Sequence, residues 1–157
     1  MKTLRYKVSV EPGINKSLKH FAKKVSEILN NKKSWKLKFV QDNNDYHFEI
    51  ILARPSLIKT TCGFGKLSCA DMVTNKIYIN LNRWIKGSKF SKLNLEGYRN
   101  YVINHEVGHI LGFDHDKPIK NRLCPVMVQQ TLSIGDAKPN PYPTRKEQKE
   151  LASKFPY

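Results

Sequence analysis

The sequence lacks any long apolar run. None of its 157 residues lies in a stretch of about 18 consecutive apolar side chains, the length that a membrane-spanning helix needs. Residues 1–10 alternate charged with apolar side chains, so the apolar segment of a signal peptide is also missing. We therefore predict neither a membrane span nor a signal peptide in this chain, and its localisation stays open.

Acidic residues are scarce. The chain has 28 Lys and Arg against 13 Asp and Glu, which gives a net charge of +15 at pH 7. Such an excess creates a positive field that attracts acidic partners, nucleic acid among them. The lysines, however, are spread from Lys2 to Lys154 between polar residues, and no nucleic-acid-binding motif accompanies them. We interpret the charge first as a solvated surface and keep a nucleic-acid face as the alternative.

Cysteine is also rare. The three cysteines, Cys62, Cys69 and Cys124, cannot form a disulfide framework, because one must be left over, and none has zinc-finger spacing. The length fits one domain that is large enough to bury a hydrophobic core.

An HExxHxxGxxH motif is the most informative feature that is present. On a helix, His105 and His109 lie on one face because residues four apart are neighbours, so both imidazoles can bind one cation. Glu106 lies about 100° around the helix, beside that cation, as a base and not as a ligand. Gly112 can end the helix in a left-handed conformation, which brings His115 back toward the same point.

Three imidazoles and one water complete a tetrahedral shell with an open position, which is typical of catalytic zinc. Zinc lowers the pKa of its bound water toward about 7, and Glu106 can then take the proton. The sequence therefore predicts one catalytic Zn²⁺, held by His105, His109 and His115, and a hydrolytic reaction.

The motif resembles that of the metzincin clan of zinc metalloendopeptidases. The resemblance implies a zinc-dependent endopeptidase with a protein or peptide substrate, and a methionine turn for which Met127 is the candidate. The chain also looks like an uncharacterised, largely actinobacterial domain family of unknown function with the same zinc motif. That likeness is strong over residues 76–143, including 80–84, 101–105, 125–131 and 139–143, and holds only in outline for the N-terminal half.

The resemblance implies further roles. Met127 would form an apolar floor under the three imidazoles, and Asp116 corresponds to a residue that hydrogen-bonds the methionine turn in some metzincins, with plain solvent exposure as the alternative. Gln129 stands where several metzincins carry a tyrosine. An amide can donate a hydrogen bond but cannot act as a phenol. Tyr142 is a weaker suggestion for a polar aromatic that reaches the site.

A disulfide between Cys62 and Cys69 is implied by the family likeness, in which cysteines occur around both positions, and a Gly-Phe-Gly turn between them allows it. Two reduced thiols are the alternative, and Cys124 remains free in either case. His20 and His47 have no partner at ligand spacing, so we expect them to face solvent or to be capped.

Periodicity predicts the order of the elements. Alternating apolar residues predict strands at 4–10, 35–40, 46–53, 66–70 and 76–81, and three- and four-residue spacing predicts helices at 15–29 and 95–111. A capping box from Thr144 to Glu147 predicts a last helix that buries Leu151 and Phe155. With the resemblance, this gives a metzincin-like α+β or α/β fold: a twisted mixed sheet of about five strands with N-terminal, active-site and C-terminal helices. We predict one monomeric catalytic domain over 1–157, with subdomains 1–115 and 116–157.

The resemblance also implies a short edge strand above the zinc that pairs with extended substrate, which an edge strand can do because it offers unpaired backbone N–H and C=O groups. The candidates are Gly65, Lys66, Leu67, Ser68 and Cys69, with a simple surface loop as the alternative. The rival function is a zinc-stabilised basic module that binds nucleic acid or an acidic partner without proteolysis. Glu106 favours the endopeptidase, because a structural zinc site does not need a base.

Overall fold

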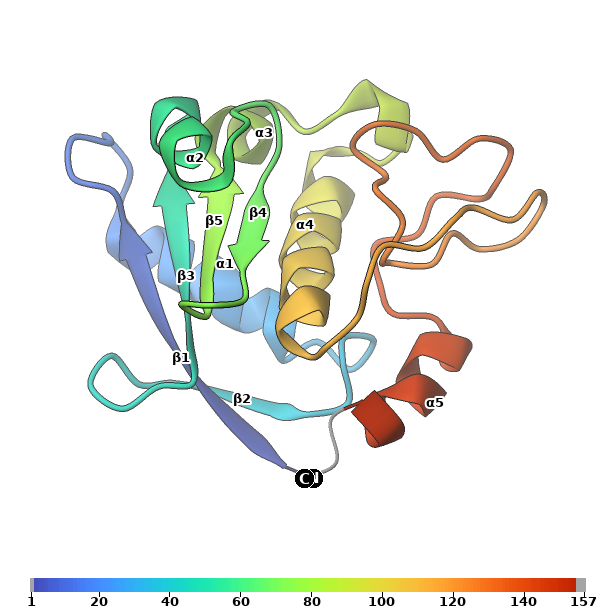
Figure 1. Cartoon of the computed structure of the whole chain (residues 1–157), viewed down its shortest axis with the longest axis horizontal. Helices are drawn as coiled ribbons and strands as arrows, with labels where there is room; N and C mark the ends of the chain where they lie inside the picture. The colour runs from blue at the N-terminus through green and yellow to red at the C-terminus, as the bar shows by residue number, and fades with distance from the viewer. Residues whose placement is uncertain (1, 155–157) are drawn as a thin grey trace.

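The computed structural model describes residues 2–154 and is built on one mixed sheet (Figure 1). The strand order is β2-β1-β3-β5-β4, with β2, β1, β3 and β5 parallel and β4 antiparallel to β5 at the edge. The strands are β1 (Thr3–Val10), β2 (Lys38–Gln41), β3 (Phe48–Ala53), β4 (Cys69–Asp71) and β5 (Lys76–Asn80). The predicted five-stranded mixed sheet is confirmed.

The two faces of the sheet are covered by different helices, because successive strand residues point to opposite sides. On one face, β1, β3 and β5 contribute side chains such as Val8, Ile50 and Ile79 to the main core, which helix α1 (Leu18–Leu29) covers from behind in Figure 1. On the other face, Ala53 and Tyr78 pack with Ile58 of helix α2 (Pro55–Cys62).

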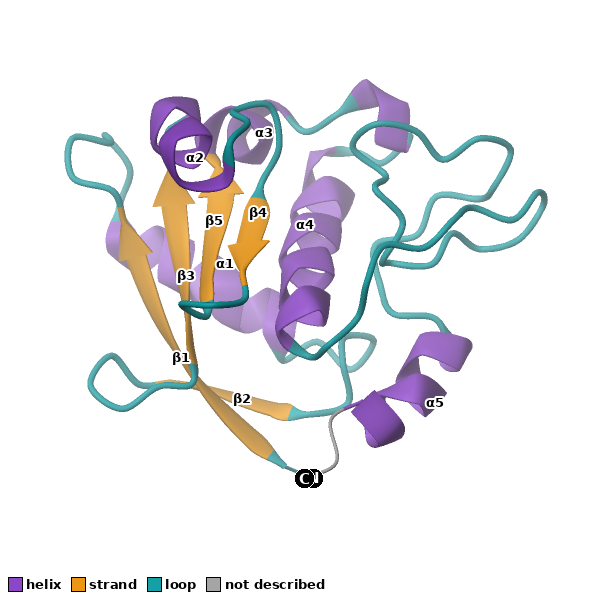
Figure 2. Cartoon of the chain, in the orientation of Figure 1, coloured by secondary structure: helices purple, strands orange, loops and turns teal. Residues whose placement is uncertain are grey.

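Helix α4 (Leu95–Ile110) stands beside β4, at the edge of the sheet (Figure 1). Asn94 caps it by accepting a hydrogen bond from the backbone N–H of Gly97. All residues from Tyr101 to Gly108 are buried, as expected for a helix that lies between a sheet and the C-terminal segment. That segment is mostly loop until helix α5 (Arg145–Lys154), as Figure 2 shows.

Two helices were not predicted. Helix α2 has Pro55 at its first position, no side-chain cap and Gly63 in a left-handed conformation at its end, so its eight residues carry only weak helix signals. Helix α3 (Leu81–Lys86) has six residues and depends on Asn80, whose side chain accepts hydrogen bonds from the N–H groups of residues 82 and 83. A 3₁₀ turn (Lys89–Ser91) follows.

Three strand boundaries were wrong. Strand β2 begins at Lys38 and not at residue 35, because Trp35 turns into the core and its Nε1 donates to the carbonyl of Asn104. Strand β3 begins at Phe48, two residues later than predicted. The short edge strand begins at Cys69 and not at residue 66.

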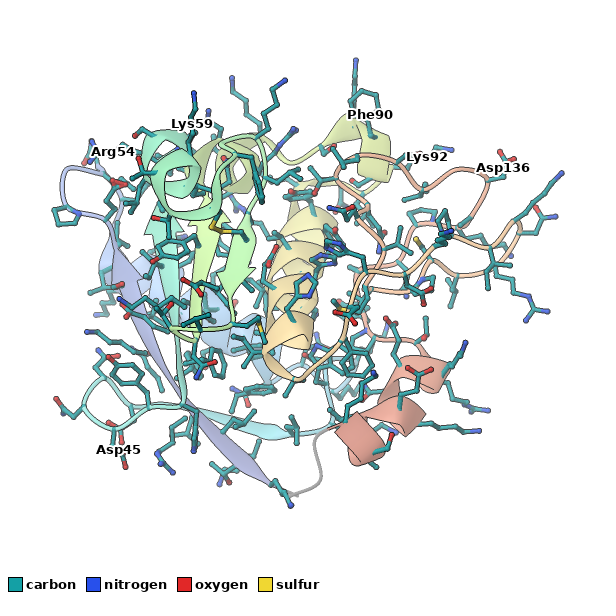
Figure 3. All side chains as sticks on the ribbon, viewed as in Figure 1. Asp45, Arg54, Lys59, Phe90, Lys92 and Asp136 are labelled. Carbon is teal, nitrogen blue, oxygen red and sulfur yellow. A yellow bond between two sulfur atoms is a disulfide. The ribbon has the colours of Figure 1, made fainter. Side chains whose placement is uncertain are left out.

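The C-terminal helix begins where the capping box predicted. Leu151 is buried, whereas the predicted burial of Phe155 lies outside the described residues. No helix in residues 2–154 is long and apolar enough to cross a membrane. Figure 3 shows charged side chains around the outline of the molecule, with Lys59 and Asp136 among those that point away from it.

Candidate metal centre

Helix α4 and the turn after it bring three imidazoles together. His105 and His109 lie one turn apart on α4, and Gly112, with φ +96°, ends the helix in a conformation that side chains rarely adopt. His115 follows three residues later. One nitrogen from each of the three rings lies within 4.8 Å of the others, which is close enough for one cation to bind all three.

Backbone carbonyls fix the orientation of two of these rings. His105 Nδ1 lies 2.8 Å from the carbonyl oxygen of Val126, and His109 Nδ1 lies 2.8 Å from that of Phe113. Because a carbonyl only accepts, each Nδ1 carries the hydrogen and each Nε2 presents a lone pair. His109 Nε2 lies 3.2 Å from His115 Nε2, so the free nitrogens converge.

The electrostatics of the site favour neutral imidazoles, the form that binds metals. Burial, followed by the neighbouring His109, lowers the pKa of His105 to about 3. Burial also lowers the pKa of His109 and that of His115. The three rings are therefore ready to donate lone pairs at neutral pH.

Glu106 is an unusual carboxylate because it is buried without a complete set of partners. Its side chain is 4% exposed, and its Oε2 is the buried side-chain atom of residues 2–154 that has no hydrogen-bond partner. Burial raises the pKa of Glu106 to about 8. A cation held by the three imidazoles in the same cleft would lower this pKa again, so the buried, unpaired oxygen fits a site that holds a cation and a water molecule.

Met127 packs against α4 at Gly108. Its Sδ lies so close to Gly108 that a Cβ at that position would collide with it. Glycine at position 108 therefore allows Met127 to approach the helix closely. Met127 is 1% exposed, and its role as a floor under the metal stays a prediction.

The turn that carries Met127 is held by two neighbouring segments. Asp116 donates its backbone N–H to the carbonyl of Met127 at 3.0 Å, whereas its side chain accepts from the N–H of Lys117. Asp116 therefore contacts the turn through its backbone, and its side chain is exposed. From the other side, Glu147 accepts hydrogen bonds from the N–H groups of Val126 and Met127.

A cleft of about 230 Å³ opens over the histidines, between α4 and the segment that leads into β4. Apart from the histidines and Glu106, its walls consist mainly of apolar and small polar side chains. They are Phe64, Leu67, Ser68, Cys69, Ala70, Met72, Tyr101, Val102, Gln129 and Thr131.

The predicted edge strand is only partly in this wall. Leu67, Ser68 and Cys69 line the cleft, but Gly65 and Lys66 do not. Gly65 and Lys66 belong to a loop whose carbonyls accept hydrogen bonds from the side chains of residues 80 and 83, so they face away from the cleft. Of the five candidates, Cys69 alone lies in β4.

The predicted disulfide is confirmed. Cys62, at the end of α2, is bonded to Cys69, the first residue of β4 (yellow bond in Figure 3). This bond ties the cleft wall to the helix that covers the sheet. Cys124 is the free cysteine, and it is buried.

Of the remaining candidate residues, one lines the cleft and three do not. Gln129, at the sequence position where several metzincins carry a tyrosine, is half-buried and lines the cleft. Tyr142 does not line the cleft and instead lies under the ammonium group of Lys33. His20 and His47 are exposed, and His47 Nδ1 accepts from the N–H of Arg5, as expected for histidines outside a metal site.

Sequence reasoning missed three contributors. Tyr101 and Thr131 line the cleft, and the hydroxyl of Tyr101 donates to the carbonyl of Val128. Glu147 was recognised as half of a capping box, but its contact with the methionine turn joins residues about 20 apart and has no local pattern.

A solved structure shares this fold over almost the whole chain. The solved structure of archaemetzincin from Methanopyrus kandleri matches with a TM-score of 0.61 over 99% of this chain and 97% of that chain. The sequence identity is 14%, so the likeness concerns the fold. It confirms the predicted fold class.

The sequence places the chain more narrowly. It belongs to the family described as protein of unknown function DUF3152, whose pattern matches residues 1–150. No curated protein matches the sequence.

Proposed function

We propose that the chain is a zinc-dependent endopeptidase in which His105, His109 and His115 hold one Zn²⁺ and Glu106 is the catalytic base. One observation carries the proposal: three imidazole nitrogens lie within 4.8 Å of one another in a cleft that is also lined by Glu106, a buried carboxylate with an oxygen that has no partner. A zinc site that only stabilised the fold would not require that carboxylate. We take residues 1–157 as one catalytic domain.

Zinc, when bound, would supply a Lewis acid that makes water more acidic and polarises the peptide carbonyl. The chain itself supplies the proton transfers. Glu106 lines the cleft, so its carboxylate can accept a proton from the attacking water and then return it to the leaving amine nitrogen. The amide of Gln129, also in the cleft wall, is our candidate to donate a hydrogen bond to the carbonyl oxygen under attack.

The cleft suggests how a peptide binds. Strand β4 pairs with β5 on one side only, and its residues Cys69 and Ala70 line the cleft, so the backbone groups of its free edge are our candidates to pair with an extended substrate. Phe64, Leu67 and Val102 present apolar surface beside Glu106. We therefore expect an unfolded or extended protein segment with an apolar side chain next to the bond that is cut.

The proposal is tested with purified protein and an unfolded casein-like substrate. We expect about one zinc per chain, because the site has one complete set of ligands. We also expect the protein to cleave this substrate at neutral pH. Glu106→Gln should keep the metal and lose cleavage. Glu96→Gln, the same change at an exposed position on the same helix, should leave both unchanged.

A zinc-loaded wild type that cleaves no peptide would contradict the proposal. The rival function, a zinc-stabilised basic module that binds nucleic acid or an acidic partner, would then have to be tested through the salt dependence of its binding.

A further inference from the structure

Glu147 is a buried carboxylate that the proposed reaction does not use. It lies in the first turn of α5, is 4% exposed and reaches back to the turn that carries Met127. Its Oε1 accepts from the N–H of Val126 at 2.9 Å, and its Oε2 accepts from the N–H of Met127 at 3.0 Å. One side chain thus holds two successive backbone donors of another segment.

The same carboxylate also closes the start of α5. Its Oε1 accepts from the backbone N–H of Thr144 at 2.9 Å and from the Thr144 hydroxyl at 3.0 Å, and the hydroxyl accepts from the N–H of Glu147. This is a capping box, which needs only contacts within the helix start. The two bonds to the methionine turn are additional, so capping alone does not account for the position of Glu147.

A single peptide group connects Glu147 to a proposed zinc ligand. The peptide between Val126 and Met127 donates its N–H to Glu147 Oε2 and offers its C=O to His105 Nδ1 at 2.8 Å. Because the peptide group is planar, fixing its N–H also fixes its carbonyl. The carbonyl in turn fixes the His105 ring, so a continuous chain of hydrogen bonds runs from the carboxylate to the imidazole.

This series of hydrogen bonds affects both the orientation of the His105 ring and the electron density at its nitrogens. A negative charge on the N–H side of a peptide makes its carbonyl a stronger acceptor, and an acceptor at Nδ1 makes the opposite nitrogen of the ring a stronger ligand. Carboxylates usually have this effect on metal-binding histidines by direct contact. Here the carboxylate is one peptide group away.

We infer that Glu147 is a positioning residue that orients His105 through the 126–127 peptide and so sets the zinc affinity of the three-histidine site from helix α5. The inference rests on the proposed zinc site. It extends that site to the C-terminal helix, which contributes no ligand and does not line the cleft.

Glu147→Gln tests the inference with little change in shape. The amide oxygen can still accept from Val126 and Thr144, but the amide nitrogen faces the N–H of Met127, so two donors oppose each other. We expect the zinc dissociation constant, measured by chelator competition on folded protein, to rise about tenfold. The visible spectrum of the cobalt-loaded protein should also change, because it reports the geometry of the ligands.

Two controls separate positioning from stability. Thr144→Ala removes the cap but leaves both bonds to the methionine turn, so it should lower the melting temperature while keeping the zinc dissociation constant within about twofold. Glu150→Gln makes the same charge change on the same helix, at a side chain without a hydrogen bond or ion pair to the described residues, and should alter neither property.

The outcomes are distinct. If wild type binds zinc and Glu147→Gln binds it equally well, or if Thr144→Ala weakens binding as much, the inference is overturned while the zinc site stands. If wild type binds no zinc, the proposed function fails and the inference fails with it. If Glu147→Gln does not fold, hydrogen exchange of the wild type tests the inference instead. Because linkage is reciprocal, zinc must slow the exchange of the Met127 amide. Equal exchange rates with and without zinc would overturn the inference.

Discussion

Gly108→Ala adds one methyl group at the point where Met127 and Trp35 pack against helix α4. The new Cβ would collide with Met127 Sδ and would lie 3.1 Å from Trp35 Cζ2 and 3.2 Å from Met127 Cε. Met127 is buried and Trp35 is 2% exposed, so neither has free space into which to move. Glycine at this position is therefore required by packing, although it weakens the helix.

The magnitude follows from two opposing terms. Alanine is favoured over glycine in a helix by about 1 kcal/mol, whereas overpacking a core costs about 1–3 kcal/mol. We expect Gly108→Ala to lower the free energy of unfolding by up to about 2 kcal/mol. In a Met127→Ala background the sulfur is gone, so the same change should be neutral or should stabilise by up to about 1 kcal/mol.

The assay is urea unfolding of the four metal-free proteins in a double-mutant cycle, which avoids any contribution from zinc. The account predicts a coupling of about 1–3 kcal/mol between the two positions. Equal destabilisation by Gly108→Ala in both backgrounds would refute the packing argument, because the effect would then not depend on Met127.

Three further predictions concern the cysteines and a buried amide. Burial raises the pKa of Cys124 to about 12, so the thiolate is scarce, and native protein should react slowly with iodoacetamide from about pH 7 to pH 9. A reaction rate that rises with pH around a midpoint near pH 8.5 would contradict this prediction. Reducing Cys62–Cys69 should lower the free energy of unfolding by about 2 kcal/mol, as chain entropy predicts for a short loop, and an unchanged urea midpoint would count against it. Asn140→Ala removes a side chain that donates to the carbonyls of Cys124 and Tyr142, and should cost about 1–3 kcal/mol in the same assay; a loss below about 0.5 kcal/mol would show that water replaces it.

The features predicted correctly depend on local patterns. The alternation in β1 and the three- and four-residue spacing in α1 are visible within a few residues, and each pattern matches how the element buries its side chains. The three ligand candidates come from a motif whose spacing is itself helix geometry. Their convergence could therefore be predicted once Gly112 was taken as the end of the helix.

The features that were missed depend on distant contacts. Trp35 fits the alternation of a strand, but its indole nitrogen finds a partner at Asn104, 69 residues away, and this removes it from the sheet. Glu147 fits a capping box, and the second half of its contacts is invisible without the fold. Gly65 and Lys66 fit an edge strand, but the side chains of residues 80 and 83 hold them in a loop.

Zinc-loaded wild type incubated with a peptide library, with the products identified by mass spectrometry, tests the central claim most directly. The account predicts cuts at internal peptide bonds next to apolar residues, made by wild type and not by Glu106→Gln that holds the same amount of zinc. An intact library with wild type, or equal cleavage by both proteins, would contradict it.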